Sequence, residues 1–371
     1  MPEALKNIYS PEAVRKLAKD IQSVYRPFMV EEFIQSTLED TWDDLGLKDR
    51  IYKISITLGS YLPQDYEAAI HILDKVVMNY GSWLDCSGMF FPIFVEVYGQ
   101  DEKDWDTSMA ALERYTPHAS GENAVRPFII RHEERMMSQM YVWSKHENEH
   151  VRRLSSEGCR PQLPMAQSLP RFKKDPTPIL PILVQLKADP SLHVRKSVAN
   201  NLNDISKTHP DLVAKLAKDW YGENEHTDWI VKQGCRTLLK QGNREVLAFF
   251  GYDDVDSIGV SDFALETDSV SIGDEMGFSF TLHAKEAIKA RLEYGIDFVK
   301  SSGKRSRKIF QLSETTLKKN EKKHYTRKQS FADVSIRKHY PGTHSITLIV
   351  NGVEQGSLDF ELVLPSGSSS C

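Results

Sequence analysis

Apolar side chains recur three and four positions apart up to about residue 250, which is the spacing of one face of an α-helix. This spacing predicts helices within EEFIQSTLEDTWDDL, DRIYKISITLGSYL, DYEAAIHILDKVVMNY and RPFIIRHEERMMSQMYVW, at residues 31–45, 49–62, 65–80 and 126–143. Short breakers, such as Pro63 and Gly81, separate these segments. Successive antiparallel helices of this kind stack into an α-solenoid, whose concave face is a binding groove.

One stretch of the helical region is repeated. Residues 147–160 read ENEHVRRLSSEGCR, and residues 223–236 read ENEHTDWIVKQGCR. Between them, HVRK at 193–196 aligns with HVRR at 150–153, so three copies follow at steps of 43 and 33 residues. Steps of this length are typical of helical-repeat arrays. The opening D-P-x-x-x-V-R of the middle copy resembles a HEAT repeat.

The middle copy predicts one helix over residues 190–207. We expect Asp189 to cap its N-terminus, with Pro190 at the first helical position. DLVAKLAKDWYG, which follows His209-Pro210, is expected to form its antiparallel partner. The buried stripe of the predicted helix consists of four apolar residues at helical spacing, Val194, Val198, Leu202 and Ile205.

The stretch HENEH at 146–150 fits H-E-x-x-H, a pattern in which two His of one helix bind zinc beside a Glu general base. A zinc peptidase is therefore one hypothesis. The second copy of the repeat has Gly222 in place of His146, so the repeated unit lacks the pattern. Both zinc ligands need one continuous helical face, whereas we expect the helix to begin between His146 and His150. Helix capping is the preferred interpretation, and no metal site is expected.

Near residues 249–259 the pattern changes to the alternation of polar and apolar residues that is typical of strands. The alternation continues through SVSIGDEMGFSFTLHA, AIKARLEYGIDFVK, RKIFQLSETTLKK, KHYTRKQSFADVSI, HSITLIVNGV and GSLDFELVL, and Asn351-Gly352 marks a tight hairpin turn. About seven strands in about 105 residues fit an immunoglobulin-like sandwich. We therefore predict a two-domain α + β chain, with a HEAT-like α-solenoid over 1–255, an immunoglobulin-like β-sandwich over 256–365 and a disordered tail over 366–371.

Composition excludes some classes of protein. The chain has 371 residues and 40% hydrophobic content, enough for the cores of two or three domains. It has no uncharged apolar run of about 18 residues and no apolar signal-peptide core, so we expect neither a membrane span nor secretion. Its four cysteines show no C-x-x-C spacing, and Cys159 and Cys235 occupy equivalent repeat positions. Such cysteines indicate a reducing compartment, and a cytoplasmic location is expected.

Charge is unevenly distributed along the chain. The net charge of −5 argues against a general nucleic-acid binder. Residues 300–328, however, hold eleven Lys and Arg against Glu314 and Glu321, a local charge of +9 that leaves −14 for the rest. Such a stretch is either one oriented face for a polyanion or a solvated basic loop, and the charge alone does not decide between them.

Three carboxylates have unusual neighbours. Asp204 ends a stripe of small polar residues, Glu157 is flanked on its helical face by arginines, and Glu122 lies in SGENAVRPF at or just before a helix start. A polar helix face, a surface Glu–Arg network and an acid favoured by the helix dipole are the ordinary structural alternatives, and they stay open. The neighbours of Asp204 are His193, Ser197, Asn200 and Asn201, and those of Glu157 are Arg153 and Arg160.

SGENAVRPF, HVRRLSSEGCRPQLPMA and DPSLHVRKSVANNLNDISKTHPD together resemble the HEAT-like DNA alkylation-repair glycosylases, in particular the AlkC branch. The resemblance covers most of 1–250, and the trailing immunoglobulin-like domain fits AlkC members that carry one. It implies a monofunctional DNA glycosylase of base excision repair. Such an enzyme hydrolyses the N-glycosidic bond of N3-alkylated bases, 3-methyladenine and 3-methylcytosine, in duplex DNA without base flipping. The implied partner is double-stranded DNA with alkylated bases. No cofactor and no membrane are implied, and we expect a monomer.

The resemblance also implies site residues. It places Glu122, Glu157 and Asp204 near the lesion as catalytic acids. Where the family has an aromatic residue, this chain has Met165, which lacks the negative ring face that attracts a cation. A non-catalytic HEAT-repeat scaffold that binds DNA or protein is the alternative function. The expected DNA contacts come from SGENAVRPF, a basic ridge through the repeats, the polar stripe and the turn SSGKRSRK: Arg126, Arg152, Arg153, Arg160, Met165, Arg171, Arg195, Lys196, Asn200, Asn201, Lys232, Arg236, Lys304, Arg305 and Arg307.

Overall fold

Helices occupy the chain up to Phe249, as the hydrophobic spacing predicts. The computed structural model describes residues 5–81, 86–334 and 337–365, so the predicted tail at 366–371 lies outside the described residues. None of the helices in these ranges has the length and apolar character needed to cross a lipid bilayer. The α-helices are α1 (Pro11–Val24), α2 (Val30–Thr37), α3 (Leu47–Tyr61), α4 (Tyr66–Val77), α5 (Phe90–Tyr98), α6 (Trp105–Tyr115), α7 (Val125–Arg131), α8 (Glu133–Trp143), α9 (Glu149–Glu157), α10 (Pro170–Lys174), α11 (Leu180–Leu186), α12 (Leu192–Ile205), α13 (Pro210–Trp220), α14 (Glu225–Gly234), α15 (Arg236–Lys240) and α16 (Arg244–Phe249). Short 3-10 helices are η1 (Leu5–Ile8), η2 (Trp42–Asp44), η4 (Glu102–Asp104) and η5 (Thr177–Ile179).

Two predicted helices are interrupted. The segment 31–45 gives α2 and the short 3-10 helix η2. α2 stops at Thr37, whose hydroxyl donates to the carbonyl of Phe33 at 2.8 Å, and Leu38 has left the helical region with φ −96° and ψ 44°. The segment 126–143 divides into α7 and α8 at His132, whose φ of −136° belongs to neither helix. Hydrophobic spacing does not detect such single-residue breaks, because the apolar face continues across them.

The three copies of the repeat begin their helices with the same kind of cap. The side chains of Asn148, Ser191 and Asn224 accept hydrogen bonds from backbone amides two or three residues further on, at the starts of α9, α12 and α14. The predicted cap at Asp189 with Pro190 in the first turn is wrong by two residues. Ser191 is the cap, at the same steps of 43 and 33 residues as the sequence repeat, because the hydroxyl there reaches the orphan amides of the first turn.

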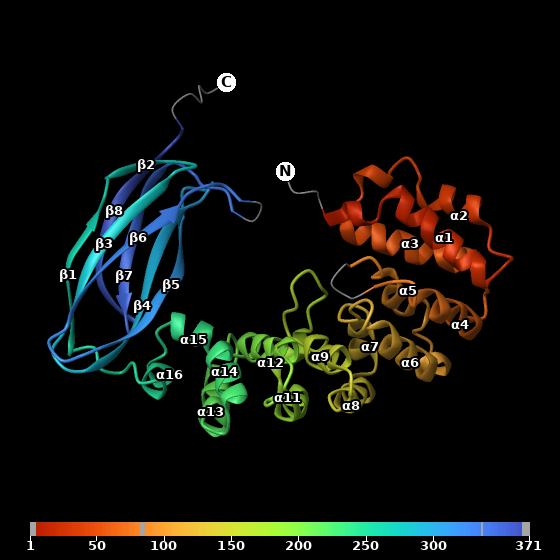
Figure 1. Cartoon of the computed structure of the whole chain (residues 1–371), viewed down its shortest axis with the longest axis horizontal. Helices are drawn as coiled ribbons and strands as arrows, with labels where there is room; N and C mark the ends of the chain where they lie inside the picture. The colour runs from red at the N-terminus through yellow and green to blue at the C-terminus, as the bar shows by residue number, and fades with distance from the viewer. Residues whose placement is uncertain (1–4, 82–85, 335–336, 366–371) are drawn as a thin grey trace. The chain divides into compact units, whose positions relative to one another are not determined.

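The first helices of successive repeats pack side by side. α12 contacts α9 on one side and α14 on the other. Figure 1 shows α9, α12 and α14 in one row, with α8 and α11 in a second layer. The predicted stripe of α12 is buried as expected, with exposures of 0–2% for Val194, Val198, Leu202 and Ile205. This confirms the helical-repeat part of the predicted fold.

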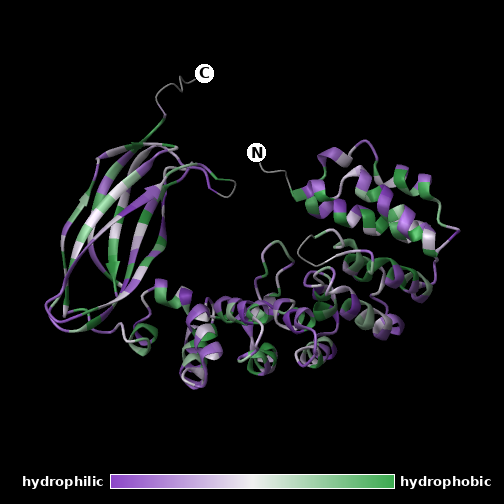
Figure 2. Cartoon of the chain, viewed as in Figure 1, coloured by the Kyte–Doolittle hydropathy of each residue, from purple (hydrophilic) through white to green (hydrophobic). Residues whose placement is uncertain are grey.

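From residue 258 onward the described chain forms eight strands in two sheets, which confirms the predicted β-sandwich (Figure 1). One sheet has the order β1-β3-β6, and the other has the order β2-β8-β7-β4-β5, with β2 and β8 the parallel pair. Apolar and polar residues alternate along the long strands (Figure 2), so that one face of each sheet lines a shared core. The strands are β1 (Ile258–Leu265), β2 (Ser269–Ser271), β3 (Glu275–Ala284), β4 (Ile288–Val299), β5 (Arg305–Leu317), β6 (Lys322–Ser330), β7 (Gly342–Val350) and β8 (Val353–Val363).

Two strand predictions need correction. The alternation did not reveal β1 as a separate strand, and SVSIGDEMGFSFTLHA divides into β2 and β3 at a turn in which Gly273 has φ +105°. The predicted strand KHYTRKQSFADVSI ends at Ser330, and its residues 335–336 lie outside the described part of the chain. The Asn351-Gly352 turn is present, with φ values of +49° and +75°.

The described chain divides into two compact units. The first extends to His209 and includes Trp220–Gly234, and the second comprises Pro210–Asp219 and the chain from Cys235 onward. Within the second unit the Asn351 amide donates to the carbonyls of Asp254 and Lys289 at 3.1 and 3.2 Å, so the hairpin turn is anchored to the segment before the sandwich. The domain boundary at residue 255 remains a proposal based on the change of pattern.

Candidate active site

Glu122 and Glu157 are joined by one arginine. Glu122 lies in the turn before α7, Glu157 ends α9, and Arg153 precedes Glu157 by one helical turn. Arg153 Nη1 donates to Glu122 Oε2 at 2.7 Å, and Arg153 Nη2 lies 3.7 Å from Glu157 Oε1. Ser120 Oγ also donates to Glu122 Oε2, at 2.9 Å. Two acids from different segments thus meet on one guanidinium.

A second arginine connects Glu157 to Asp204 of α12. Arg160 Nη1 donates to Glu157 Oε1 at 2.6 Å, and Arg160 Nε donates to Asp204 Oδ2 at 2.9 Å. Lys207 Nζ donates to the other oxygen, Asp204 Oδ1, at 2.8 Å. Three carboxylates and three cations therefore alternate in what we call the acid–arginine chain: Glu122, Arg153, Glu157, Arg160, Asp204 and Lys207.

Exposure decreases along the acid–arginine chain. The Glu122 side chain is 23% exposed, that of Glu157 is 6% exposed and that of Asp204 is 2% exposed. Burial alone would lower the pKa of Arg160, but the adjacent Glu157 and Asp204 carboxylates more than offset it and raise that pKa. Arg160 therefore stays charged between two buried acids, and Glu122 is the acid that solvent or a ligand reaches most readily.

The small polar stripe of α12 faces its neighbouring helix. Asn201, an expected DNA contact, is instead fully buried and donates to the carbonyl of Ser156 on α9 at 2.8 Å. Ser197 is also buried, whereas Asn200 is half-buried. The stripe is small because α9 and α12 approach closely there, and this close approach brings Arg160 within reach of Asp204.

Arg126 does not lie on an open DNA-facing surface, contrary to the expectation from its motif. Its side chain on α7 is 1% exposed. Nη1 donates to the carbonyl of Gly158 at 2.9 Å, and Nε donates to the carbonyl of Gln167. Burial lowers the pKa of Arg126 to about 10, so it remains a cation at neutral pH. The side chain thus connects α7 to two other segments of the protein.

Arg152 and Arg195, equivalent residues of two repeats, brace the turns before their helices. Arg152 makes two hydrogen bonds with the Asp189 carboxylate, at 2.7 and 3.1 Å, and Nη1 donates to carbonyls five and six residues earlier. Arg195 Nη1 donates to carbonyls at the same two offsets. Both predicted DNA contacts therefore stabilise the protein itself, which explains why Arg follows Val in the first two copies; the third copy has Thr227-Asp228 at the equivalent positions.

The remaining predicted DNA contacts lie at different places. On the first unit, Met165 is 74% exposed with φ +59°, Lys196 is exposed on α12, and Lys232 is half-buried on α14. Arg171 is exposed and pairs with Glu133 at 2.6 Å. The other four belong to the second unit: Arg236, half-buried at the start of α15; Lys304, exposed before β5; Arg305, which donates to Ser345 Oγ at 2.9 Å; and Arg307, which pairs with Asp297 at 2.8 Å and with Glu354.

Lys207 is the member of the acid–arginine chain that the sequence analysis missed. It follows Asp204 by three residues, the spacing at which two side chains on one helix face meet. The spacing was visible, but the residue lies outside the repeat motif that drew attention to its neighbours.

HENEH forms a helix start. α9 begins at Glu149, so His146 precedes the helix and His150 lies inside it, as predicted. His146 Nδ1 accepts from the amide of Asn148 at 3.0 Å, and its Nε2 lies 3.5 Å from Glu113 Oε1. Across the described ranges, no three His, Cys, Asp or Glu side chains gather as a metal ion would require.

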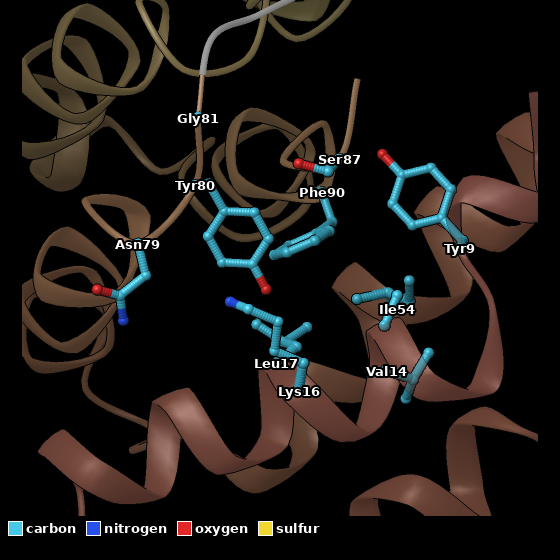
Figure 3. A pocket seen from close by; sticks show the side chains of 11 residues that line it. Tyr9, Val14, Lys16, Leu17, Ile54, Asn79, Tyr80, Gly81, Ser87 and Phe90 are labelled. Carbon is cyan, nitrogen blue, oxygen red and sulfur yellow. The ribbon is translucent and has the colours of Figure 1, made fainter. Parts of the chain in front are cut away.

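A separate cavity of about 220 Å³ lies among the N-terminal helices (Figure 3). The rings of Tyr9, Tyr80 and Phe90 line it, together with aliphatic residues of α1 and α3. Among the described residues that line it, the one charged side chain is Lys16, which is paired with Asp20 at 2.6 Å and lies over the Tyr80 ring. No carboxylate lines this cavity among the described residues, so we place the candidate chemistry at the acid–arginine chain instead.

Comparison with known proteins identifies both parts of the molecule. A family model described as "DNA alkylation repair enzyme" matches residues 118–238, which include the whole acid–arginine chain. A second, "Uncharacterised protein YhaZ, C-terminal Ig-like domain", matches residues 259–364. The uncharacterized protein YhaZ of Bacillus subtilis is 46% identical over 358 residues, which cover 96% of this chain and 99% of YhaZ.

A solved structure shares the complete fold. It is the Pseudomonas fluorescens alkylpurine DNA glycosylase AlkC, bound to DNA containing an abasic site analogue. The two chains are 36% identical with a TM-score of 0.92, and the match covers 97% of this chain and 99% of that one. The chain therefore belongs to the DNA alkylation repair enzyme family, in the AlkC branch that carries a C-terminal immunoglobulin-like domain.

Proposed function

We propose that this protein is a monofunctional DNA glycosylase that hydrolyses the N-glycosidic bond of N3-alkylated bases, 3-methyladenine and 3-methylcytosine, in duplex DNA. One observation carries the proposal: acids from three separate segments meet through Arg153 and Arg160 in the part of the chain that the repair family matches. The name and DNA ligand of the AlkC structure support the same class of reaction.

The chemistry fits a site made of carboxylates. A 3-methylated adenine or cytosine carries a positive charge, so it leaves without a strong general acid. Cleavage produces an oxocarbenium-like sugar, which a nearby carboxylate stabilises. A carboxylate that accepts a hydrogen bond from water also orients that water for attack on the sugar carbon. No covalent intermediate is needed.

The exposures suggest different tasks for the three proposed catalytic acids. Glu122 is the most exposed and is the one we assign to the sugar and the attacking water. Both oxygens of Asp204 accept from cations, and Glu157 accepts from Arg160. These two acids offset the charges of the buried arginines, so that the accessible carboxylate of Glu122 can attract a cationic base and a developing cationic sugar.

Cleavage without base flipping is part of the proposal. A base-flipping enzyme needs a pocket for the extruded base. Here Glu157 and Asp204 lie on α9 and α12 and Glu122 lies in the turn before α7, and the described lining of the cavity in Figure 3 contains none of these acids. Exposed cations of the first unit, Lys196 and Lys207 of the α12 region and Arg171, are suited to phosphate contacts that hold a duplex against these faces.

The direct test is chromatography of bases released from N-methylated duplex DNA by the purified protein. We expect free 3-methyladenine, with 3-methylcytosine as a second product, and none from unmethylated DNA. Folded protein that binds methylated and unmethylated duplex alike and releases no base would instead be a DNA-binding scaffold.

A further inference from the structure

The buried guanidinium of Arg126 connects segments that carry the proposed site. One acceptor, the carbonyl of Gly158, immediately follows Glu157. The other, the carbonyl of Gln167, belongs to the loop 161–169, two residues after Met165. Arg126 itself follows Glu122 by four residues. A single side chain therefore links the Glu122 segment, the end of α9 and the loop.

Other attachments hold the ends of the loop, where the Leu163 and Leu169 side chains are buried. Backbone hydrogen bonds close it, from the amide of Leu169 to the carbonyl of Pro161 at 3.2 Å and from that of Ala166 to the carbonyl of Leu163 at 3.3 Å. The Met165 side chain at its tip is 74% exposed, and its φ of +59° is one that residues other than glycine seldom adopt. Interactions outside the tip must hold Met165 in this conformation, and the hydrogen bond from Arg126 Nε to the Gln167 carbonyl is one of them.

We infer that Arg126 is a positioning residue for the proposed glycosylase, which fixes the Met165 loop relative to Glu122 and Glu157. This inference rests on the proposed function, but it assigns Arg126 no contact with DNA. The geometry requires a guanidinium, because its Nε and Nη1 reach the two carbonyls together. Nη2 has no hydrogen-bond partner among the described residues, so Nε is the one nitrogen of Arg126 that binds the loop. A lysine has a single donor nitrogen and cannot copy this fork.

The test is a double-mutant cycle in single-turnover base excision with Arg126→Met, Met165→Ala and the double variant. Arg126→Met should lower the excision rate constant about 10- to 100-fold while the DNA dissociation constant changes less than about threefold, because a misplaced group slows the chemical step. Met165→Ala should lower the excision rate constant by a clearly smaller factor in the Arg126→Met background than in the wild type, since the loop is already misplaced there. Additive effects of the two substitutions would overturn the inference.

Hydrogen exchange supplies a readout that does not depend on activity. Amides of residues 158–169 should exchange faster in Arg126→Met and in Arg126→Lys than in the wild type. Arg131→Met, which removes an exposed arginine from the same helix, should leave them unchanged. Unchanged exchange in both Arg126 variants would overturn the inference. If the wild-type protein releases no methylated base, the proposed function fails, and hydrogen exchange alone decides whether Arg126 positions the loop.

Discussion

Two buried arginine–carboxylate networks of the described chain can be compared, one from each architecture. In the five-stranded sheet, Arg291 pairs with Glu293 two residues away on β4 and with Glu314 directly opposite on β5, at 2.7 and 2.8 Å. In the helical region, Arg160 pairs with acids on α9 and α12 at similar distances. The distances are alike, but the origins differ. The sheet network follows from strand register, whereas the helical one requires three segments to pack.

This difference shows which network is a candidate site. Arg291 and Glu293 are 2% and 1% exposed and lie on one sheet face, so their charges mainly neutralise one another. Exposure separates the two networks only slightly, because Glu314 of the sheet network is 18% exposed and Glu122 of the acid–arginine chain is 23% exposed. Ion pairs alone are thus a weak indication of function, because structural pairs look the same locally. Three acids from separate segments, joined through two arginines within the part of the chain that the repair family matches, are a stronger one.

The largest expected contrast between the networks is in catalysis. Asp204→Asn removes one charge from between Arg160 and Lys207 and should lower single-turnover base excision about 100-fold or more. Glu314→Gln makes the same chemical change in the sheet and should leave excision by folded protein within about twofold. Equal losses in both variants would mean that the helical acids are no closer to the reaction than those of the sheet.

A smaller contrast concerns stability. Arg160→Met leaves Glu157 and Asp204 buried without their shared guanidinium and should reduce the free energy of unfolding by about 3–5 kcal/mol. Arg307→Met removes an arginine that is 37% exposed and should cost about 0–1 kcal/mol. Urea unfolding of both variants checks this order, and a reversed order would contradict the burial on which the comparison depends.

The pH dependence of stability should be smaller still and shared by both regions. Burial, with Arg153 and His150 nearby, lowers the pKa of His193 to about 4, and burial also lowers the pKa of His344 in the sandwich. The folded state disfavours the protonated rings, so stability should fall as pH decreases from about 6.5 towards 4. His193→Gln should flatten this slope in urea unfolding measured at several pH values. An unchanged slope would show that His193 titrates alike in the folded and unfolded states.

Sequence reasoning predicted the contacts of the acid–arginine chain that join residues close together in the sequence. Arg153 and Arg160 flank Glu157 at helical spacing, so their pairing was visible as an ordinary Glu–Arg network, and the structure shows both contacts. The contact of Arg160 with Asp204 joins residues 44 positions apart and depends on the approach of α9 to α12, which spacing alone does not give. The resemblance to a known family, not the periodicity, suggested that these acids belong together.

Other features of the fold were misjudged for local reasons. Asp189 looks like a cap because Asp-Pro commonly starts a helix. Its carboxylate binds Arg152 instead, and the Ser191 hydroxyl accepts from the first amides of α12. Arg126 was expected at a DNA-binding surface because arginine side chains are usually exposed to solvent. Its burial could not be foreseen, because its two acceptors are backbone carbonyls, which carry no sequence signal.

The most direct measurement is single-turnover release of 3-methyladenine by Glu122→Gln and by the wild type, with the DNA dissociation constant measured in the same samples. Glu122 is the partly exposed end of the acid–arginine chain, so this substitution changes the fold least. We predict a rate constant at least about 100-fold lower than that of the wild type and a dissociation constant within about threefold. If the folded Glu122→Gln variant releases 3-methyladenine at the wild-type rate, the claim that the acid–arginine chain performs the chemistry is contradicted.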